Sequence, residues 1–311
     1  MAFVLRPATE ADAPRIAEIL SAIDPDPVTP EEVINWERSF PRGGTQLRLV
    51  AVDGNDRAAG WAVASHSPYG RPGKFRQWVA IDPVMRMQGV GSLLTGATEQ
   101  FAREHGATLL ETDVRDSEHH SISFAEHRGF RQTEHLFESL LDLSTFDDAR
   151  FAGVGESTGL RFFTMDEAPD LEAAERKLYA LSAATVPDQP GYDGIAFPPF
   201  EDWRRRVISF TDTRLDCFWV AADGDRFVGH TRLAWRAPTR TMYTEFTGVL
   251  REYRGRHVAL ALKLQSVQSA RRYGARFMRT NNSSRNGPML AVNRNLGYQD
   301  QPGVFIMRKE L

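Results

Sequence analysis

The sequence predicts an α/β (α+β) protein made of two copies of one domain, each with a mixed central sheet flanked by helices. Two observations carry this prediction. The chain has 311 residues, a length typical of two domains. Residues 77–130 also align without gaps with residues 245–298 at a constant offset of 168, a period too long for a solenoid and typical of a duplicated domain.

Matched residues make the repeat visible along the chain. Arg86 aligns with Arg254, and Gly129-Phe130 aligns with Gly297-Tyr298. The stretch between the copies, DDARFAGVGESTG, is polar and rich in glycine, which is typical of a linker. We therefore expect one domain at residues 1–146, a linker at 147–158 and a second domain at 159–311.

Each copy is expected to begin with a short strand and a helix with acidic residues in its first turn. Two strands then form a hairpin that turns at Asp53-Gly54 in the first copy and at Asp223-Gly224 in the second, a favoured hairpin signal. The opening strands are predicted at residues 3–6 and 160–163, and the hairpins at 47–65 and 217–234.

A fourth strand, a loop and a long helix follow the hairpin. In the first copy the helix repeats apolar residues at helical spacing and ends before Gly106. A fifth strand, a short helix and a last strand pair complete each copy. The fourth strands are predicted at residues 75–81 and 242–249, and the fifth at 108–114 and 276–281.

Composition excludes several classes of protein. A net charge of −3 argues against a general nucleic-acid binder, and no apolar run approaches the ~20 residues that cross a bilayer. The N-terminus has neither a basic region nor a cleavage site typical of a signal peptide. The single Cys217 lies in a predicted strand and favours a reducing, cytoplasmic location. We expect a monomer or homodimer with no nucleic-acid or membrane partner.

One motif indicates a chemistry. The hexapeptide RMQGVG, residues 86–91, follows a strand, opens an amphipathic helix and precedes a distant Arg-Gly-Phe. A helix N-terminus attracts phosphate, and glycines let its oxygens approach the backbone. In this context the motif resembles the acyl-CoA motif Q/R-x-x-G-x-G/A of the GNAT superfamily, the Gcn5-related N-acetyltransferases. The resemblance covers nearly the whole chain and implies two tandem GNAT domains with splayed sheets.

The resemblance implies acetyl-CoA as co-substrate and no metal. The loop amides would hold the pyrophosphate of acetyl-CoA. The pantetheine arm would lie in the gap between the fourth and fifth strands and pair with the backbone of the fourth strand. The expected first-copy residues are Val79, Ile81, Arg86, Met87, Gln88, Gly89, Val90, Gly91 and Ser92. The expected second-copy residues are Val249, Arg254, Gly255, Arg256, Val258, Ala259 and Asn286.

The second copy departs from the motif at one position. His257 stands where the first glycine of the pattern belongs, so we expect weaker cofactor binding there. Its downstream segment is more complete, because Asn286 matches the family's asparagine while the first copy has Glu118 at that place.

Candidate catalytic groups are less clearly marked. Many family members have an acidic Tyr four residues before the Gly of the Gly-Phe pair, where this chain has Ala125 and Asn293. The candidate bases are Glu245 in the second copy and Glu118 and His120 in the first. Glu245 is equally well read as an ion-paired strand carboxylate, and for the first-copy pair a solvated loop is the favoured reading.

The sequence thus predicts an acyl-CoA-dependent N-acyltransferase. The expected reaction moves acetyl from acetyl-CoA to the amine of a small molecule by direct attack in a ternary complex. The alternative is a non-catalytic acyl-CoA-binding or interaction protein, which the missing Tyr acids and the altered second loop favour. Release of the CoA thiol in an acceptor screen distinguishes the two.

Overall fold

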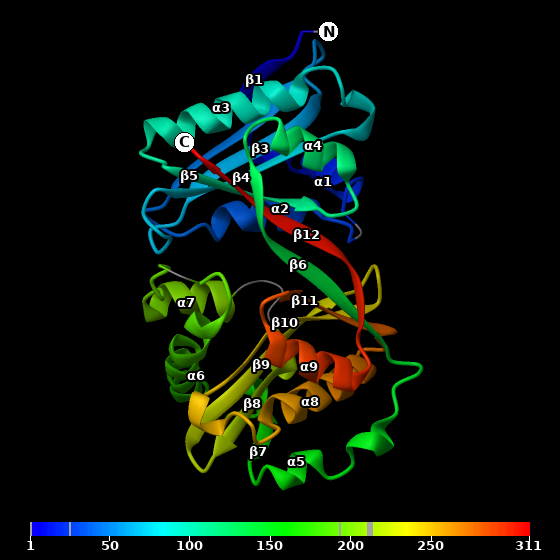
Figure 1. The fold of residues 1–311 in the computed structure, drawn as a ribbon. Coiled ribbons are helices and arrows are strands. Elements are labelled where there is room, and N and C mark those ends of the chain that lie inside the picture. Colours follow the sequence, from blue (N-terminus) through cyan, green and yellow to red (C-terminus); the bar gives the residue numbers. More distant parts are fainter. Residues whose placement is uncertain (1, 25, 193, 210–213) are drawn as a thin grey trace. The chain divides into compact units, whose positions relative to one another are not determined.

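The computed structural model describes residues 2–24, 26–192, 194–209 and 214–311, and the chain forms two compact units (Figure 1). The first unit comprises residues 1–134 and 304–311, and the second comprises residues 135–303. Each unit has the predicted mixed sheet flanked by helices, so the expected fold class is confirmed.

The sheet of the first unit has the order β1-β2-β3-β4-β5-β12. Only β4 and β5 are parallel, whereas every other neighbouring pair is antiparallel. The strands are β1 (Val4–Pro7), β2 (Thr45–Val52), β3 (Ala58–His66), β4 (Lys74–Ile81), β5 (Leu109–Arg115) and the residues from Val304 onward of β12 (Gln299–Glu310).

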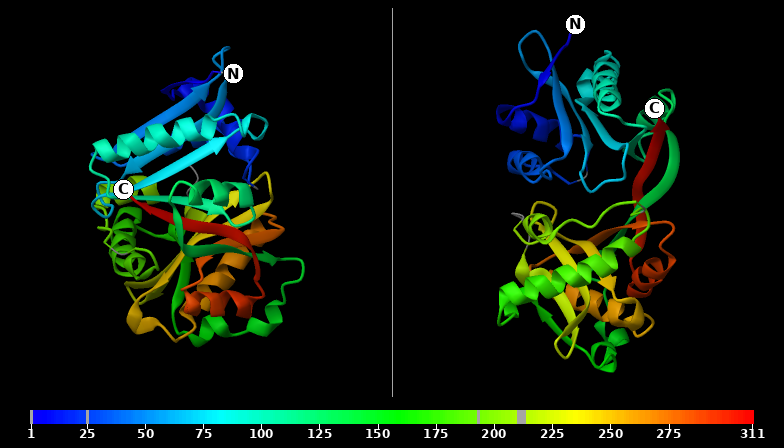
Figure 2. Two further views of the ribbon diagram at one scale, coloured as in Figure 1. Left: turned by 45° about the horizontal axis from the view of Figure 1, so that its top comes forward. Right: turned by 90° about the vertical axis from the view of Figure 1, so that its left-hand side faces the viewer.

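Helices cover both faces of this sheet, as the right-hand view of Figure 2 shows. Alternate residues of β2 point to opposite faces, because side chains alternate along a strand. Val50 packs with Ile16 of α1 on one face, and Ala51 packs with Leu94 of α3 on the other. The helices of this unit are α1 (Ala13–Ser21), α2 (Pro30–Arg38), α3 (Val90–Glu104) and α4 (His119–Glu126).

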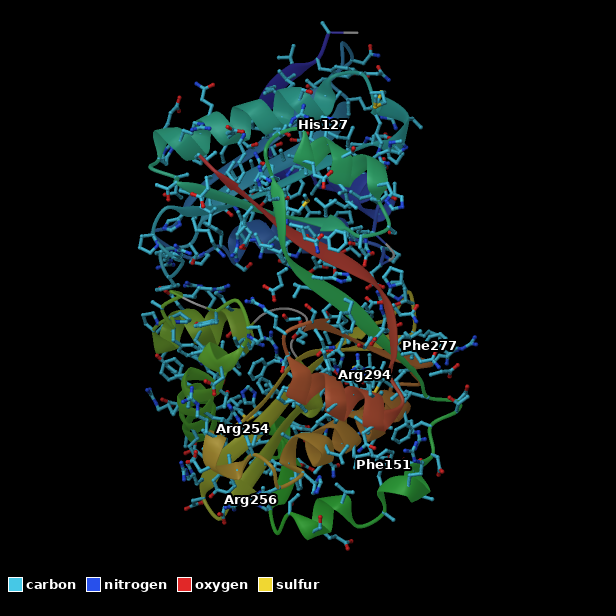
Figure 3. All side chains as sticks on the ribbon, in the orientation of Figure 1. His127, Phe151, Arg254, Arg256, Phe277 and Arg294 are labelled. Carbon is cyan, nitrogen blue, oxygen red and sulfur yellow. The ribbon has the colours of Figure 1, made fainter. Side chains whose placement is uncertain are left out.

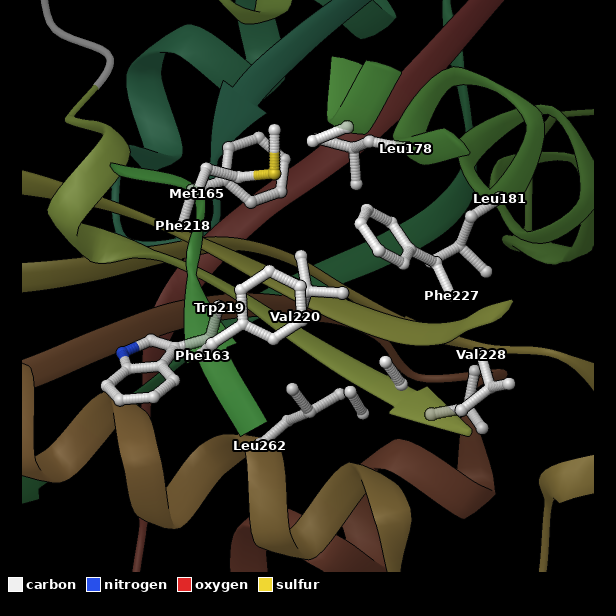
Figure 4. Packing of buried hydrophobic residues seen from close by; sticks show 14 of the residues in the cluster. Phe163, Met165, Leu178, Leu181, Phe218, Trp219, Val220, Phe227, Val228 and Leu262 are labelled. Atoms are coloured by element: carbon white, nitrogen blue, oxygen red, sulfur yellow. The ribbon is translucent and has the colours of Figure 1, made fainter. Parts of the chain in front are cut away.

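The sheet of the second unit has the order β6-β11-β10-β9-β8-β7. Figure 4 shows its larger core, a cluster of buried residues that includes Phe218 and Val220 of β8, Leu178 of α6 and Leu262 of α8. The strands are β6 (Arg131–Asp142), β7 (Arg161–Thr164), β8 (Phe218–Asp223), β9 (Arg226–Arg236), β10 (Thr241–Val249) and β11 (Phe277–Ser283). The helices are α5 (Val154–Ser157), α6 (Leu171–Thr185), α7 (Phe200–Val207), α8 (Val258–Arg272) and α9 (Gly287–Leu296).

The last strands of the two copies are exchanged. Residues 304–310 of β12 pair with β5 of the first unit, and residues 136–142 of β6 pair with β11 of the second. The compact units therefore differ from the boundaries expected at residues 146 and 159. Each exchanged strand pairs antiparallel with its neighbour. The exchange therefore satisfies the same backbone N–H and C=O groups that pairing within one copy would satisfy.

The segment expected to be a linker is folded. Residues 148–151 form a short 3₁₀ helix, and α5 follows it. Phe151 is buried in a core of the second unit, and Asp148 pairs with Arg271 of α8 at 2.5 Å. This glycine-rich stretch therefore packs as part of the second unit.

Within the described ranges, no helix has both the length and the apolar character needed to cross a membrane.

Candidate acyl-CoA site

Each sheet opens into a V at its one pair of central parallel strands. In the first unit the β4–β5 pairing runs from Lys74–Leu109 to Arg76–Glu111. In the second it runs from Thr241–Phe277 to Tyr243–Arg279. Beyond these pairs β4 and β10 keep their register with β3 and β9 only. The predicted cofactor residues Val79, Ile81 and Val249 lie on the splayed parts of β4 and β10.

The first loop connects β4 to α3 through a 3₁₀ turn at Pro83–Met85. Met87 and Gly89 both have left-handed backbone conformations, with φ of 63° and 87°. Gly89 is the N-cap of α3, and Val90 begins the helix with a buried side chain. The unpaired N–H groups and the positive dipole end of α3 thus lie at this loop.

Glycine is favoured at the two motif positions for different structural reasons. A Cβ on Gly89 would meet no atom within 4 Å, so it is the left-handed φ, and not crowding, that favours glycine there. A Cβ on Gly91 would lie 3.2 Å from the ring of Phe124 in α4. Gly91 therefore allows α4 to pack closely against the first turn of α3.

A cation that sequence reasoning missed lies at the same helix end. Arg128 follows α4, donates to Oγ of Ser92 at 2.5 Å and stacks its guanidinium 3.5 Å from the centre of the Phe124 ring. Burial lowers the pKa of Arg128, and no carboxylate pairs with it within the described part of the chain. The only signal in the sequence was its place in the Arg-Gly-Phe tripeptide.

The predicted Arg86 and Glu118 are brought together. Arg86 donates to Glu118 at 3.4 Å, which links the loop to the N-cap of α4. His119 and His120 are exposed in the first turn of that helix. Glu118 therefore lies beside the predicted cofactor loop, while Gln88 is exposed and bonds weakly to the preceding turn.

The second loop repeats the backbone of the first. Gly255 and His257 are left-handed, with φ of 73° and 59°, and His257 is the N-cap of α8. Val258 is buried like Val90. Figure 3 shows Arg254 and Arg256 on this loop. Arg254 is held by Asp188, whose pKa is lowered to about 2 by hydrogen bonds from Arg251 and Arg254.

Gln77 and Glu245, matched in the sequence, do not lie at equivalent places. A β-bulge between Thr244 and Phe246 inserts Glu245 into β10. As a result Thr244, and not Glu245, faces α8 in the way that Gln77 faces α3. Gln77 is buried and donates to Oγ1 of Thr98 at 2.7 Å. Glu245 is partly exposed and pairs with Arg232 at 2.7 Å.

The positions of the family's Tyr acid are buried in both units. Ala125 packs in the core of the first unit. Asn293 is 1% exposed, and neither atom of its amide has a hydrogen-bond partner among the described residues. Asn286, the predicted cofactor residue upstream of it, is the N-cap of α9 and accepts from the Met289 amide at 3.4 Å. Ala259 lies in the first turn of α8.

Other nucleophilic or metal-binding groups are not assembled in the described ranges. No group of three His, Cys, Asp or Glu side chains there is arranged to hold a metal ion. Cys217 is fully buried, and burial raises the pKa of its thiol to about 11. A thiol of that kind is a packing residue, because the thiolate is the reactive form.

Comparison with known proteins gives the same picture. The model of the acetyltransferase (GNAT) family matches residues 13–130 and 178–298. A GCN5-related N-acetyltransferase from Sphaerobacter thermophilus is similar in structure, with a TM-score of 0.70, 23% identity, and coverage of 99% of this chain and 95% of that one. A tandem GNAT protein from the clavulanic acid biosynthesis pathway is similar with a TM-score of 0.77, 18% identity, and coverage of 99% and 98%.

A third similar structure is the GCN5-related glucosamine N-acetyltransferase region of a fungal multi-domain β-N-acetylglucosaminidase. Its TM-score is 0.72 at 15% identity, and the match covers 99% of this chain and 38% of that one. No curated relative matches the sequence. The two family matches, one in each copy, and the two splayed sheets lead to one conclusion: the chain belongs to the GNAT acetyltransferase family and carries two GNAT domains in tandem.

Proposed function

We propose that this protein is an N-acetyltransferase that moves the acetyl group of acetyl-CoA to the amine of a small molecule. The observation that carries the proposal is the first unit's splayed β4 followed by a left-handed glycine and a helix N-terminus. The free backbone edge of β4 offers amide groups to an extended pantetheine arm. The loop amides offer a site for pyrophosphate.

Charged side chains support this assignment at the phosphate end. Arg128 donates to Ser92 of the first helical turn, and none of the ion pairs found in the described ranges includes it. Arg86 pairs with Glu118 at 3.4 Å, a long and exposed contact that a phosphate can replace at little cost. Both cations complement a ligand that carries several negative charges.

The proposed mechanism is direct attack of a neutral amine on the thioester. In the first unit, backbone N–H groups on the splayed part of β4, near Val79, polarise the thioester carbonyl in the transition state, and Glu118 or His120 takes the proton of the ammonium. In a reaction within the second unit, Glu245 would be the base. A thiolate is a tolerable leaving group because its conjugate acid has a pKa near ~8.5, so water can protonate it even though this chain has Ala125 where the family has Tyr.

Release of the CoA thiol in a panel of small-molecule amines tests the proposal. We expect turnover with at least one amine and loss of turnover in Gly89→Trp, which fills the space above the loop. Glu118→Gln, His120→Gln and Glu245→Gln identify the base, because only loss of the base removes the acidic limb of the pH profile of kcat/KM.

Acetyl-CoA binding without thiol release from any amine would instead support a non-catalytic acyl-CoA-binding protein. That outcome would agree with Ala125 and Asn293 at the acid positions and with the ion pair between Glu245 and Arg232. We further propose a cytoplasmic location, supported by a single, buried cysteine.

A further inference from the structure

A polar pocket lies at the end of the first unit's sheet opposite to the proposed cofactor loop. Its volume is about 470 Å³, within the usual range for small-molecule sites. The pocket lies where β4 and β5 begin, and the proposed cofactor loop follows the opposite end of β4. Eight residues of extended strand separate the two, about 26 Å at the usual rise. The lining residues are Arg71, Pro72, Lys74, Thr108, Leu109, Gly129, Arg131, Thr133, Arg308 and Glu310.

Two of the lining cations, Lys74 and Arg308, are held in place by ion pairs to one buried carboxylate. Glu111 of β5 is 5% exposed and accepts from Lys74 at 2.9 Å and from Arg308 at 2.8 Å. Arg308 lies directly opposite Glu111 in the β5–β12 register. One carboxylate thus holds two cations on neighbouring strands, and a paired, buried side chain is a pre-organised one.

Two further arginines carry unbalanced charge. Arg71 and Arg131 are exposed, and within the described ranges no carboxylate lies within ion-pair distance of either. The lining thus holds four cations and the carboxylate of Glu310, and with Glu111, which pairs with Lys74 and Arg308, the group has a net charge of +2. A guanidinium presents a planar fork of donors that fits carboxylate and phosphate groups.

From this arrangement we propose that the pocket binds a small molecule through a carboxylate or phosphate group, at a site separate from the proposed acyl-CoA site. Arg71 and Arg131 clasp the oxyanion, and the Lys74–Glu111–Arg308 group fixes its orientation. The exchanged strand completes the site, because Arg308 and Glu310 come from β12. A pocket of the first unit therefore includes residues from the last strand of the chain.

Calorimetric titration of the full chain tests the proposal, with inorganic phosphate and succinate as probes at constant ionic strength. The double variant Arg71→Gln/Arg131→Gln should weaken binding about tenfold or more, the usual effect of losing charged hydrogen bonds. The control Arg42→Gln/Arg57→Gln removes two exposed arginines of the same unit that are not among the residues lining this pocket and should bind like wild type.

The variant Gly89→Trp, which should lose the tighter acetyl-CoA site, separates this test from the test of the proposed function. Saturable binding that persists in Gly89→Trp and is lost in Arg71→Gln/Arg131→Gln supports the pocket even if no amine is ever acetylated. Binding of phosphate alone identifies a phosphate ligand, and binding of succinate alone a carboxylate ligand. Equal binding in all variants, or no saturable binding at millimolar concentrations, overturns the proposal. Circular dichroism of each variant checks that it folds.

Discussion

Gly89 and His257 occupy the same left-handed backbone position, one residue before the helix that follows the splayed strand. Their φ angles are 87° and 59°, and each is the N-cap of its helix. A residue with a Cβ costs roughly 1–2 kcal/mol in this conformation. The second loop thus keeps the backbone of the first at some cost in stability, and the two differ in the exposed imidazole that His257 adds at the N-cap.

The first prediction is that the two units bind acetyl-CoA unequally. In titrations of the full chain, Gly89→Trp should abolish the tighter site, whereas His257→Gly should strengthen the weaker one. Because glycine adopts the left-handed conformation without strain, His257→Gly should also raise the free energy of unfolding by about 1 kcal/mol. Equal affinities in the wild type, or a first site that survives Gly89→Trp, would contradict the assignment.

The second prediction concerns Arg128. Arg128→Ala should weaken acetyl-CoA binding about tenfold or more, because a charge-assisted hydrogen bond to phosphate is lost. The matched control is Arg103→Ala, which removes an exposed arginine of α3 that pairs with Glu99 at 2.8 Å. The control should leave the dissociation constant unchanged. A similar loss in both variants would mean that only the overall charge of the unit matters.

The third prediction follows from the strand exchange. Met307 of β12 and Met278 of β11 are both fully buried, the first in a core of the first unit and the second in a core of the second. Each change to alanine should cost about 2–5 kcal/mol. Hydrogen exchange should then show lost protection of β5 in Met307→Ala and of β10 in Met278→Ala.

The same hydrogen-exchange experiment can contradict the strand exchange. If Met307→Ala exposed the amides of β11 and left those of β5 protected, the last strand would pair within its own copy, and the exchange would be wrong.

The fourth prediction concerns a buried lysine. Lys263 of α8 is 2% exposed, its ammonium lies 5.3 Å from the Tyr298 ring, and burial lowers its pKa to about 7. Between that value and the ordinary 10.5, the unfolded chain holds a proton that the folded chain lacks. The free energy of unfolding should therefore rise with pH across this window.

Lys263→Met should remove that rise and stabilise the protein at pH 7, because the cost of burying an ammonium disappears. Denaturant unfolding at pH 7 and at pH 9.5 measures both effects. Lys177→Met, at an exposed lysine of α6, should keep the wild-type slope. A wild type whose stability is flat across the window would show that Lys263 stays protonated when folded.

Much of this fold could be predicted from local patterns. The hairpins at Asp53-Gly54 and Asp223-Gly224 form as expected, and the helix after β4 ends at Glu104, close to the predicted stop before Gly106. The loop motif was found because glycine and a helix start are local features. Arg128 was missed as a partner of Ser92 because 36 residues separate them, and nothing in the pattern specified how α4 packs on α3.

Local sequence and tertiary structure determined different features of this molecule. The sequence by itself determined the duplication, the order of elements and the position of the first loop, because periodicity and glycine act over a few residues. Only the tertiary structure decided that β12 pairs with β5, that Glu245 sits in a bulge and that four cations meet in one pocket. The two copies offer equivalent sheet edges, so local sequence does not distinguish a strand's own edge from the other copy's. Long-range packing makes that choice.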